Sequence, residues 1–230
     1  MLLLFDIDGT LLHTSGVGTR AMVAAGRSVF GPSFSAEGVE FAGRLDPLII
    51  GEMLERSGVC ATAEQMSVFT ERYTRELGDS LARANAAPAP GVIRLLDALA
   101  QEAATLAVLT GNIATAGRMK LSACGIDPDR FALHVWGDES PRTPPRRADL
   151  VEVAMARFGA MTGSMPGPSG VVVIGDTPGD VECGKAHGCR VLAVATGKFS
   201  VEQLRACGPD LTLPTLERTD EVIGWLLSRK

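Results

Sequence analysis

The sequence lacks any apolar run long enough for a membrane-spanning helix, which needs about 18 residues. The apolar start, Met1 to Phe5, is also too short for the hydrophobic region of a signal peptide, and no basic residue precedes it. We therefore expect a protein that stays in the cytoplasm and does not contact a membrane.

An excess of one charge and a pattern of paired cysteines are lacking as well. The 230 residues carry a net charge of -5 without a block of like charges, which argues against a non-specific nucleic-acid binder. The five cysteines are an odd number, and no two have the C-x-x-C spacing, so we expect reduced thiols. With 46% hydrophobic residues, the composition is that of an ordinary globular protein. A small molecule is the expected partner, and the sequence does not distinguish a monomer from a homodimer.

Residues 16–87 predict an all-helical block. Helical patterns occur in three segments: Thr19–Phe30, Pro47–Ser57 and Thr62–Ala84. The last of them opens with a capping box, Thr62-Ala63-Glu64-Gln65. Segments with linker-like composition, Ser15–Gly18 and Ala86–Gly91, border the block on both sides. A helical block between two hinges predicts a cap domain that acts as a lid.

From Gly91 onward, predicted helices and strands alternate. The strands are apolar runs at Thr105–Leu109, Phe131–Val135, Val171–Ile174 and Arg190–Val194. The helices are expected near residues 91–103, 114–124, 147–159 and 179–188. Two weaker elements follow, around Leu211–Leu213 and Asp220–Ser228. This alternation predicts an α/β fold, a doubly wound parallel sheet of the Rossmann-like kind in residues 1–15 and 88–230, with the helical cap domain inserted.

The first predicted strand ends in two carboxylates, Asp6 and Asp8, followed by a glycine and a threonine. Ligands of open α/β sheets bind at the carboxyl ends of the strands. Two carboxylates this close repel each other unless a cation compensates them, and a divalent metal ion is the usual cation. Because side chains alternate along a strand, we expect one acid to be nucleophile and metal ligand and the other to exchange protons. An ordinary acidic turn is the alternative.

Polar residues follow two further strands and are expected at the same edge. Thr110-Gly111-Asn112 offers hydroxyl, amide and backbone N–H groups to a phosphate oxygen, unless it only forms a turn and a helix cap. Asp176 is placed to share a metal ion with Asp6. Asp180 either helps to hold that ion or merely caps the next helix.

The site also needs a positive side chain to hold phosphate and carboxylate together. The sequence has only four lysines: Lys120, Lys185, Lys198 and Lys230. Lys120 and Lys185 lie in helices that run away from the strand ends, so we expect them to point away from the site. Arg146 and Arg147 open a helix on the correct edge, and Arg147 is the preferred cation. Arg146, Lys120 and a merely solvated Arg147 stay open as alternatives.

These motifs together resemble the haloacid dehalogenase superfamily, specifically its phosphatase branch with a helical cap, of the phosphoglycolate-phosphatase-like kind. The resemblance runs through nearly the whole chain and rests on Phe5–Leu11, Leu109–Asn112, Arg146–Leu150 and Val173–Asp180, with two glycines behind the last stretch. It implies that Asp6 is the nucleophile and Asp8 the general acid and base. It further implies that Thr110 holds the phosphate, with Gly111 and Asn112 beside it. Magnesium would be held by acids among this set: Asp6, Asp8, Asp176 and Asp180.

Two further parts of the chain bear on the resemblance: the position of the usual lysine, where the chain differs from the family, and a loop of the cap. The family usually has a lysine where this chain offers Arg147, whose fork binds phosphate bidentately but does not lose its proton. The stretch Phe41–Asp46 resembles a cap loop that faces the active site. Arg44 in that loop either contacts the leaving group of the substrate or forms a surface salt bridge to Asp46 or Glu40.

The predicted function is that of a magnesium-dependent phosphomonoesterase, which acts on a small phosphorylated metabolite through an aspartyl phosphate. The second acid, Asp8, argues against a dehalogenase, and the absence of lysine from residues 1–119 argues against a phosphonatase. A phosphomutase of the same superfamily stays an alternative. From another class, so does a phospho-accepting signalling module without turnover. Phosphoglycolate and small sugar phosphates are the substrates that the resemblance suggests.

Overall fold

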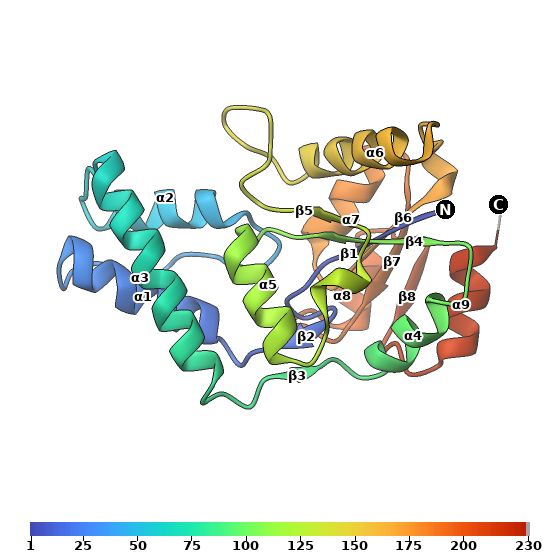
Figure 1. Ribbon diagram of the computed structural model, residues 1–230, viewed down its shortest axis with the longest axis horizontal. Coiled ribbons are helices and arrows are strands. Elements are labelled where there is room, and N and C mark those ends of the chain that lie inside the picture. Colours follow the sequence, from blue (N-terminus) through green and yellow to red (C-terminus); the bar gives the residue numbers. More distant parts are fainter. Residues whose placement is uncertain (229–230) are drawn as a thin grey trace.

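The computed structural model describes residues 1–228, so that Arg229 and Lys230, the end of the predicted core segment, lie outside the described residues. Within the described part, a parallel sheet of six strands forms the centre, in the order β5-β4-β1-β6-β7-β8 (Figure 1). The strands are β1 Leu2–Phe5, β4 Thr105–Leu109, β5 Leu133–Val135, β6 Val171–Gly175, β7 Arg190–Val194 and β8 Leu211–Leu213. The predicted α/β class and parallel sheet are confirmed.

Strand β1 lies between β4 and β6, with Phe5 level with Val108 and Ile174. Since all neighbouring pairs in this sheet are parallel, the residues that follow these three strands reach one edge together. The predicted convergence of Asp6, Thr110 and Asp176 at that edge therefore follows from the strand order.

Helices cover both faces of the sheet because successive strand residues point to opposite sides. Leu3 and Phe5 pack into the core that carries α4, α5 and α9, which span Val92–Leu99, Ala114–Ala123 and Thr219–Leu227. Leu2 and Leu4 pack on the other face, against α6, α7 and α8, which span Asp149–Thr162, Pro178–Lys185 and Val201–Ala206. Short 3-10 helices precede β5 and β6, at Pro128–Arg130 and Pro168–Gly170.

Three helices lie to one side of the sheet and form the cap (Figure 1). They are α1 Val17–Phe30, α2 Asp46–Arg56 and α3 Ala63–Leu81. Their apolar faces build a separate core that includes Phe34 and Phe69. The predicted capping box at Thr62 is present, and α3 ends at Leu81 rather than at Ala84. The predicted boundaries of the cap domain, residues 16 and 87, stay a proposal.

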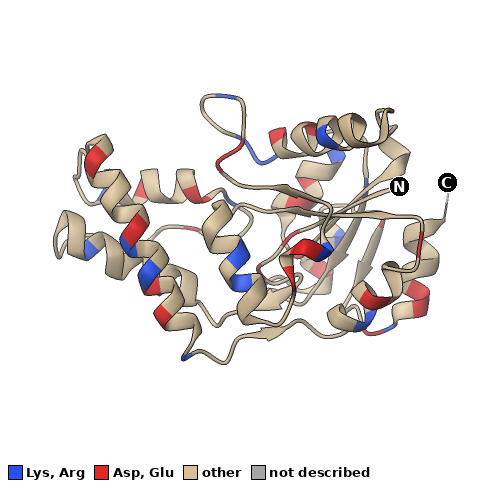
Figure 2. Cartoon of the chain, viewed as in Figure 1, with Lys and Arg blue, Asp and Glu red and all other residues tan. Residues whose placement is uncertain are grey.

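Two short strands, β2 Leu12–His13 and β3 Ala87–Pro88, pair antiparallel where the chain enters and leaves the cap. The sequence did not predict them, since two-residue strands have no periodicity and their composition is that of a linker. Basic and acidic residues alternate along the surface of α3, without a stripe of one sign (Figure 2). Among the described residues, no helix combines the length and the apolar character that a membrane crossing needs.

Candidate active site

A cavity of about 760 Å³ lies between the carboxyl edge of the sheet and the cap. The ends of β1, β4 and β6 form its floor, while α1, α3 and the loop before α2 contribute cap residues to its walls. The predicted site residues that line it are Asp6, Asp8, Arg44, Thr110, Gly111, Asn112, Arg147 and Asp176. The strand order thus brings together side chains that are up to 170 positions apart in the sequence.

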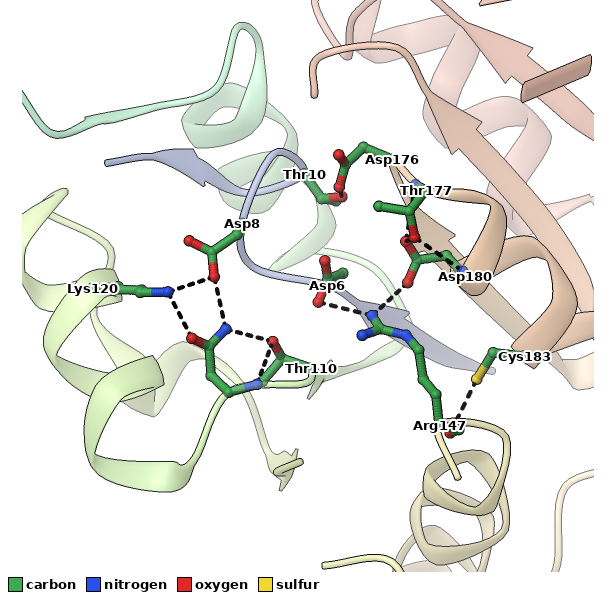
Figure 3. Close-up of polar contacts among 11 residues, drawn as sticks. Asp6, Asp8, Thr10, Thr110, Lys120, Arg147, Asp176, Thr177, Asp180 and Cys183 are labelled. Carbon is green, nitrogen blue, oxygen red and sulfur yellow. Dashed lines mark hydrogen bonds and ion pairs between the residues drawn. The ribbon is translucent and has the colours of Figure 1, made fainter. Parts of the chain in front are cut away.

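Three buried carboxylates lie near one another beyond the ends of β1 and β6, and one arginine contacts two of them (Figure 3). We call this group the Arg147 cluster: Asp6, Arg147, Asp176 and Asp180. Arg147 Nη2 lies 3.0 Å from Asp6 Oδ1 and 2.5 Å from Asp180 Oδ1. One carboxylate oxygen of each aspartate lies within 4.8 Å of the other two. Arg146, the neighbouring candidate, has a side chain that is 63% exposed and pairs with Asp149 instead.

Glycines make room for two of these carboxylates. A Cβ atom on Gly9 would lie 2.3 Å from Asp176 Oδ2, and one on Gly197 would lie only 1.7 Å from the same oxygen. A Cβ atom on Gly175 would lie 2.1 Å from Asp180 Cγ. Because each contact is too short for two heavy atoms, the carboxylates occupy space that only glycine leaves free.

The aspartates of the Arg147 cluster are electrostatically costly. Burial, opposed by Arg147 and reinforced by Asp180 and Asp8, raises the pKa of Asp6 to about 6. Burial and the two neighbouring carboxylates raise the pKa of Asp176 well above its ordinary value. Burial lowers the pKa of Arg147, but Asp180 and Asp6 outweigh it, so that this pKa lies above its usual range. The arginine therefore stays charged and compensates only part of the negative charge.

The chemistry of this donor set fits a divalent metal ion. Three carboxylates converge on one point, and a single guanidinium leaves them with excess negative charge. Carboxylate oxygens are the ligands that magnesium prefers, and a bound cation favours their ionised form. The buried group therefore fits Mg²⁺ in charge and in ligand type.

Asp8 belongs to a different group, although the sequence also counted it among the metal ligands. We call this group the Lys120 cluster: Asp8, Thr110, Asn112 and Lys120 (Figure 3). Lys120 Nζ donates to Asp8 Oδ2 and to Asn112 Oδ1, each at 2.6 Å. Asn112 Nδ2 donates to Asp8 Oδ2 at 2.8 Å and to Thr110 Oγ1 at 2.9 Å. The Asp8 carboxylate thus points to Lys120, away from the three acids of the Arg147 cluster.

The expectation that Lys120 points away from the site was wrong. Lys120 lies on α5 and is only 6% exposed, and its ammonium group lines the cavity. Side chains of a helix tilt toward its N-terminus, and a lysine is long enough to span more than one turn, so Lys120 reaches back to the strand ends. Burial lowers its pKa, but Asp8 and Asp46 outweigh this and raise the pKa above its ordinary value. For Lys185 the expectation holds, since its ammonium contacts the backbone carbonyl of Gly208.

Gly111 is the point where the cap touches the sheet edge. A Cβ atom there would lie 2.0 Å from the carbonyl oxygen of Arg44 and 3.3 Å from Arg147 Nη1. Its own carbonyl accepts a 2.7 Å hydrogen bond from the backbone N–H of Asp46, the first residue of α2. Asp46 Oδ2 in turn accepts from the N–H of Ile113, at 2.9 Å, so that it caps α5 from the cap side. Burial raises the pKa of Asp46 to about 6.

Arg44 lines the cavity but already has partners. Its Nη1 lies 2.5 Å from Glu52 Oε2 and donates to the carbonyl of Glu40 at 3.0 Å. Of the two roles left open for Arg44, the salt bridge is present, with Glu52 as its partner instead of Asp46 or Glu40. Glu40 instead pairs with Lys198 across the cavity mouth, at 2.6 Å.

Of the two roles that the sequence left open for Asp180, the structure shows the helix cap. Its side chain accepts from the backbone N–H and the hydroxyl of Thr177 in a capping box that opens α7, and its other oxygen contacts Arg147. Thr10, part of the first motif but not assigned a role, donates from Oγ1 to Asp176 Oδ1 at 2.9 Å. Two further lining residues, Asp46 and Tyr73, come from cap helices, and neither was assigned a role in the site from the sequence.

Comparison with known proteins agrees with this geometry. A family model described as haloacid dehalogenase-like hydrolase matches residues 3–194. Probable phosphatase IndB of Dickeya dadantii (strain 3937) is 28% identical over 230 residues, which cover 97% of this chain and 92% of that protein. The phosphoglycolate phosphatase of Haemophilus influenzae (strain ATCC 51907 / DSM 11121 / KW20 / Rd) is 27% identical, over 90% of both chains.

Among solved structures, CbbY from Rhodobacter sphaeroides in complex with xylulose-(1,5)-bisphosphate superimposes with a TM-score of 0.75, at 19% identity over 94% of each chain. At this level of identity, the similarity shows that the two proteins share a fold. The chain belongs to the haloacid dehalogenase-like hydrolases. Because the family model describes hydrolases and the relatives above are named as phosphatases, this chain is a phosphatase within that family.

Proposed function

We propose that the protein is a magnesium-dependent phosphomonoesterase that forms an aspartyl phosphate on Asp6 and acts on a small phosphorylated metabolite. The observation that carries this proposal is the pairing of the two clusters across one cavity. The Arg147 cluster offers a carboxylate beside excess buried negative charge, and the Lys120 cluster holds a second carboxylate, Asp8, in a fixed orientation.

Asp6 is the proposed nucleophile. Its carboxylate attacks phosphorus while the bond to the leaving alcohol breaks, and the aspartyl phosphate is then hydrolysed by water. Asp8 gives a proton to the departing alcohol oxygen and takes one from the attacking water. Lys120 and Asn112 act as positioning residues, because their hydrogen bonds fix the carboxylate of Asp8 at the cavity wall.

Thr110 and Arg147 are the proposed holders of the phosphoryl group, with Gly111 and Asn112 between them. Arg147 uses Nη2 for the two aspartates, while Nη1 lies beside Gly111, where it can donate to a phosphoryl oxygen. Thr110 is one of the residues that line the cavity floor, and it is fully buried.

The proposed ligands of magnesium are Asp6, Asp176 and Asp180, and we no longer include the carboxylate of Asp8 in that set. When bound there, the ion supplies positive charge that lets the carboxylate and the phosphoryl dianion approach each other. The glycines around Asp176 and Asp180 keep the two carboxylates in place for this purpose. The proposed substrates, phosphoglycolate and small sugar phosphates, agree with the name of the Haemophilus influenzae relative and with the sugar bisphosphate bound to CbbY. A cytoplasmic location and a monomeric or homodimeric state stay predictions.

The test is phosphate release from a panel of esters that includes p-nitrophenyl phosphate, 2-phosphoglycolate and small sugar phosphates, with magnesium or with a chelator. We expect release that the chelator abolishes, and an acid-quenched sample that carries one phosphate on Asp6. Isomerised sugar phosphate without inorganic phosphate would favour a phosphomutase, and phosphorylation without turnover would favour a signalling module. Release that persists in chelator would overturn the metal-dependent mechanism.

A further inference from the structure

The cavity has a second wall that the mechanism above does not use. It lies next to the Lys120 cluster and is formed by the cap helices α1 and α3. Tyr73, on α3, contributes its hydroxyl to this wall. The ring belongs to the apolar core of the cap and stacks on Phe69, with ring centroids 6.2 Å apart and an angle of 13° between the planes. The ring is therefore rigidly held.

The hydroxyl of Tyr73 has no hydrogen-bond partner among the described residues, although the side chain is only 1% exposed. Among the described residues, the buried polar side-chain atoms without a partner are Arg147 Nε and Arg190 Nε, so the hydroxyl oxygen of Tyr73 is not fully enclosed and is accessible to a hydrogen-bond partner. Since Tyr73 lines the cavity, its hydroxyl is turned toward the space that a ligand occupies.

This hydroxyl lies in the same part of the cavity as Lys120, which is the hydrogen-bond partner of the proposed general acid. A Cβ atom on Gly18 would lie 3.3 Å from Lys120 Nζ and 3.9 Å from Tyr73 Oη, so both polar groups converge on the same point of α1. Lys120 in turn lies 2.6 Å from Asp8. A leaving alcohol whose ester oxygen meets Asp8 therefore extends toward Tyr73.

The surrounding charges select what Tyr73 can bind. Burial, Asp46 and Asp8 raise the pKa of Tyr73 well above its ordinary value, so the group is a neutral donor. The cation beside Gly18, Lys120, is already shared between Asp8 and Asn112. An anionic group on the leaving alcohol would face two carboxylates here, whereas a neutral hydroxyl can accept from Tyr73 without repulsion.

We propose that Tyr73 is a specificity-determining residue, whose hydroxyl donates a hydrogen bond to an uncharged oxygen carried by the leaving alcohol near the ester bond. The substrate class is then a phosphate monoester of a polyhydroxy alcohol rather than of a hydroxy acid. This inference rests on the proposed phosphatase function and adds a recognition contact to it.

Three small esters that differ only in their terminal group test the proposal: ethyl phosphate, 2-hydroxyethyl phosphate and 2-phosphoglycolate. We expect the wild-type protein with magnesium to have its highest kcat/KM on 2-hydroxyethyl phosphate. In Tyr73→Phe this kcat/KM should fall about tenfold, as for the loss of one hydrogen bond, while the value for ethyl phosphate stays within about twofold. Thr74→Val is the matched control, since it removes a hydroxyl of α3 that donates only to the carbonyl of Thr70.

Three results would overturn the assignment. An equal loss on all three esters in Tyr73→Phe would mean that the hydroxyl acts through packing. No loss on any of them would mean that it does not contact the substrate. A wild-type preference for 2-phosphoglycolate over 2-hydroxyethyl phosphate would contradict the choice of an uncharged group.

A binding measurement separates this inference from the proposed function. In the Asp6→Asn background, calorimetry gives the dissociation constants of 2-hydroxyethyl phosphate and ethyl phosphate with and without Tyr73→Phe. We expect the second substitution to weaken only the hydroxyethyl ester, again about tenfold. If wild-type protein releases no phosphate from any ester, the proposed function fails, while the selective binding loss still supports the contact. Equal affinities for both esters in both variants would overturn the contact itself.

Discussion

The two clusters on the cavity floor differ in how their charges are compensated (Figure 3). In the Lys120 cluster, one cation and one amide satisfy a single carboxylate, Asp8, which is also 42% exposed in its side chain. In the Arg147 cluster, three carboxylates are buried and the one cation contacts only two of them, Asp6 and Asp180. Both groups lie at ends of neighbouring strands, so the contrast does not follow from the fold.

The difference indicates a division of labour. A satisfied hydrogen-bond network holds its members in one arrangement, which suits a residue that must exchange protons at a fixed position. Buried carboxylates whose negative charge is only partly compensated favour the binding of a further cation. We therefore expect the Lys120 cluster to respond to substitution mainly in kcat, and the Arg147 cluster to respond in metal affinity and stability as well.

The largest effect is expected for Asp6→Asn. Loss of the nucleophile should lower kcat by at least about 10⁴-fold, since the remaining groups cannot form the covalent intermediate. The fold should stay intact, because asparagine keeps the shape and still accepts from Arg147. Phosphate release measures the loss of activity, and a thermal melt measures whether the fold is intact. Asp79→Asn, an exposed position on α3, is the control and should leave both unchanged. Retained activity in Asp6→Asn would place the nucleophile elsewhere.

Lys120→Met should have the next largest effect. It tests whether the Lys120 cluster acts on kcat without affecting the metal dependence that we assign to the Arg147 cluster. We expect kcat to fall by about 10² to 10³-fold, in the range of general acid–base catalysis, because Asp8 loses its orientation. The pH dependence of kcat should also shift, whereas the magnesium dependence of the melting temperature should not. Lys120→Arg is the conservative control and should recover part of the activity.

The comparison variant is Arg147→Met, which leaves three buried carboxylates without a cation. Removing one partner of a buried ion pair typically costs about 3–5 kcal/mol, so we expect a clear loss of stability that magnesium partly restores. If Lys120→Met destabilises the metal-free protein as much as Arg147→Met does, the electrostatic contrast between the clusters is wrong.

Much of the sheet could be predicted from local sequence. The apolar runs at Thr105–Leu109 and Arg190–Val194 have the same bounds as β4 and β7. These strands are buried on both faces, and a continuous apolar run is the direct consequence. Because each strand ends at a turn with polar residues, the meeting of Asp6, Thr110 and Asp176 followed from the fold class.

The rest of the site depends on distances that the sequence does not express. Lys120 was misplaced because the direction of a helix says little about the reach of a long side chain. Asp46 and Tyr73 come from the cap, and their approach to the floor depends on how the cap docks, here through Gly111.

Asp46→Asn tests whether a second carboxylate, in addition to Asp8, disturbs the Lys120 cluster. The folded-state pKa of Asp46, about 6, lies above its unfolded value near 3.8, so the unfolded chain ionises first. Its ionisation therefore lowers stability as the pH rises from about 4 to about 6, by an amount on the order of 3 kcal/mol. Asn keeps the acceptor for Ile113, and the variant should be more stable above pH 6 and equally stable at pH 4. Urea unfolding at both pH values measures this difference. A variant that is destabilised equally at both would show that the carboxylate serves packing alone.

For Asp176→Asn, the sign of the effect on stability depends on magnesium. Without metal, the variant should be more stable than the wild type, because burial and its acidic neighbours penalise the ionised form of Asp176 in the folded state. With metal, the loss of one charged ligand should raise the magnesium concentration at half-maximal stabilisation about tenfold or more. Melting temperatures across a magnesium titration give both quantities without an activity assay, and Asp79→Asn provides the baseline. An unchanged titration would show that Asp176 is not a magnesium ligand. The excess negative charge of the Arg147 cluster would then have no compensating metal ion.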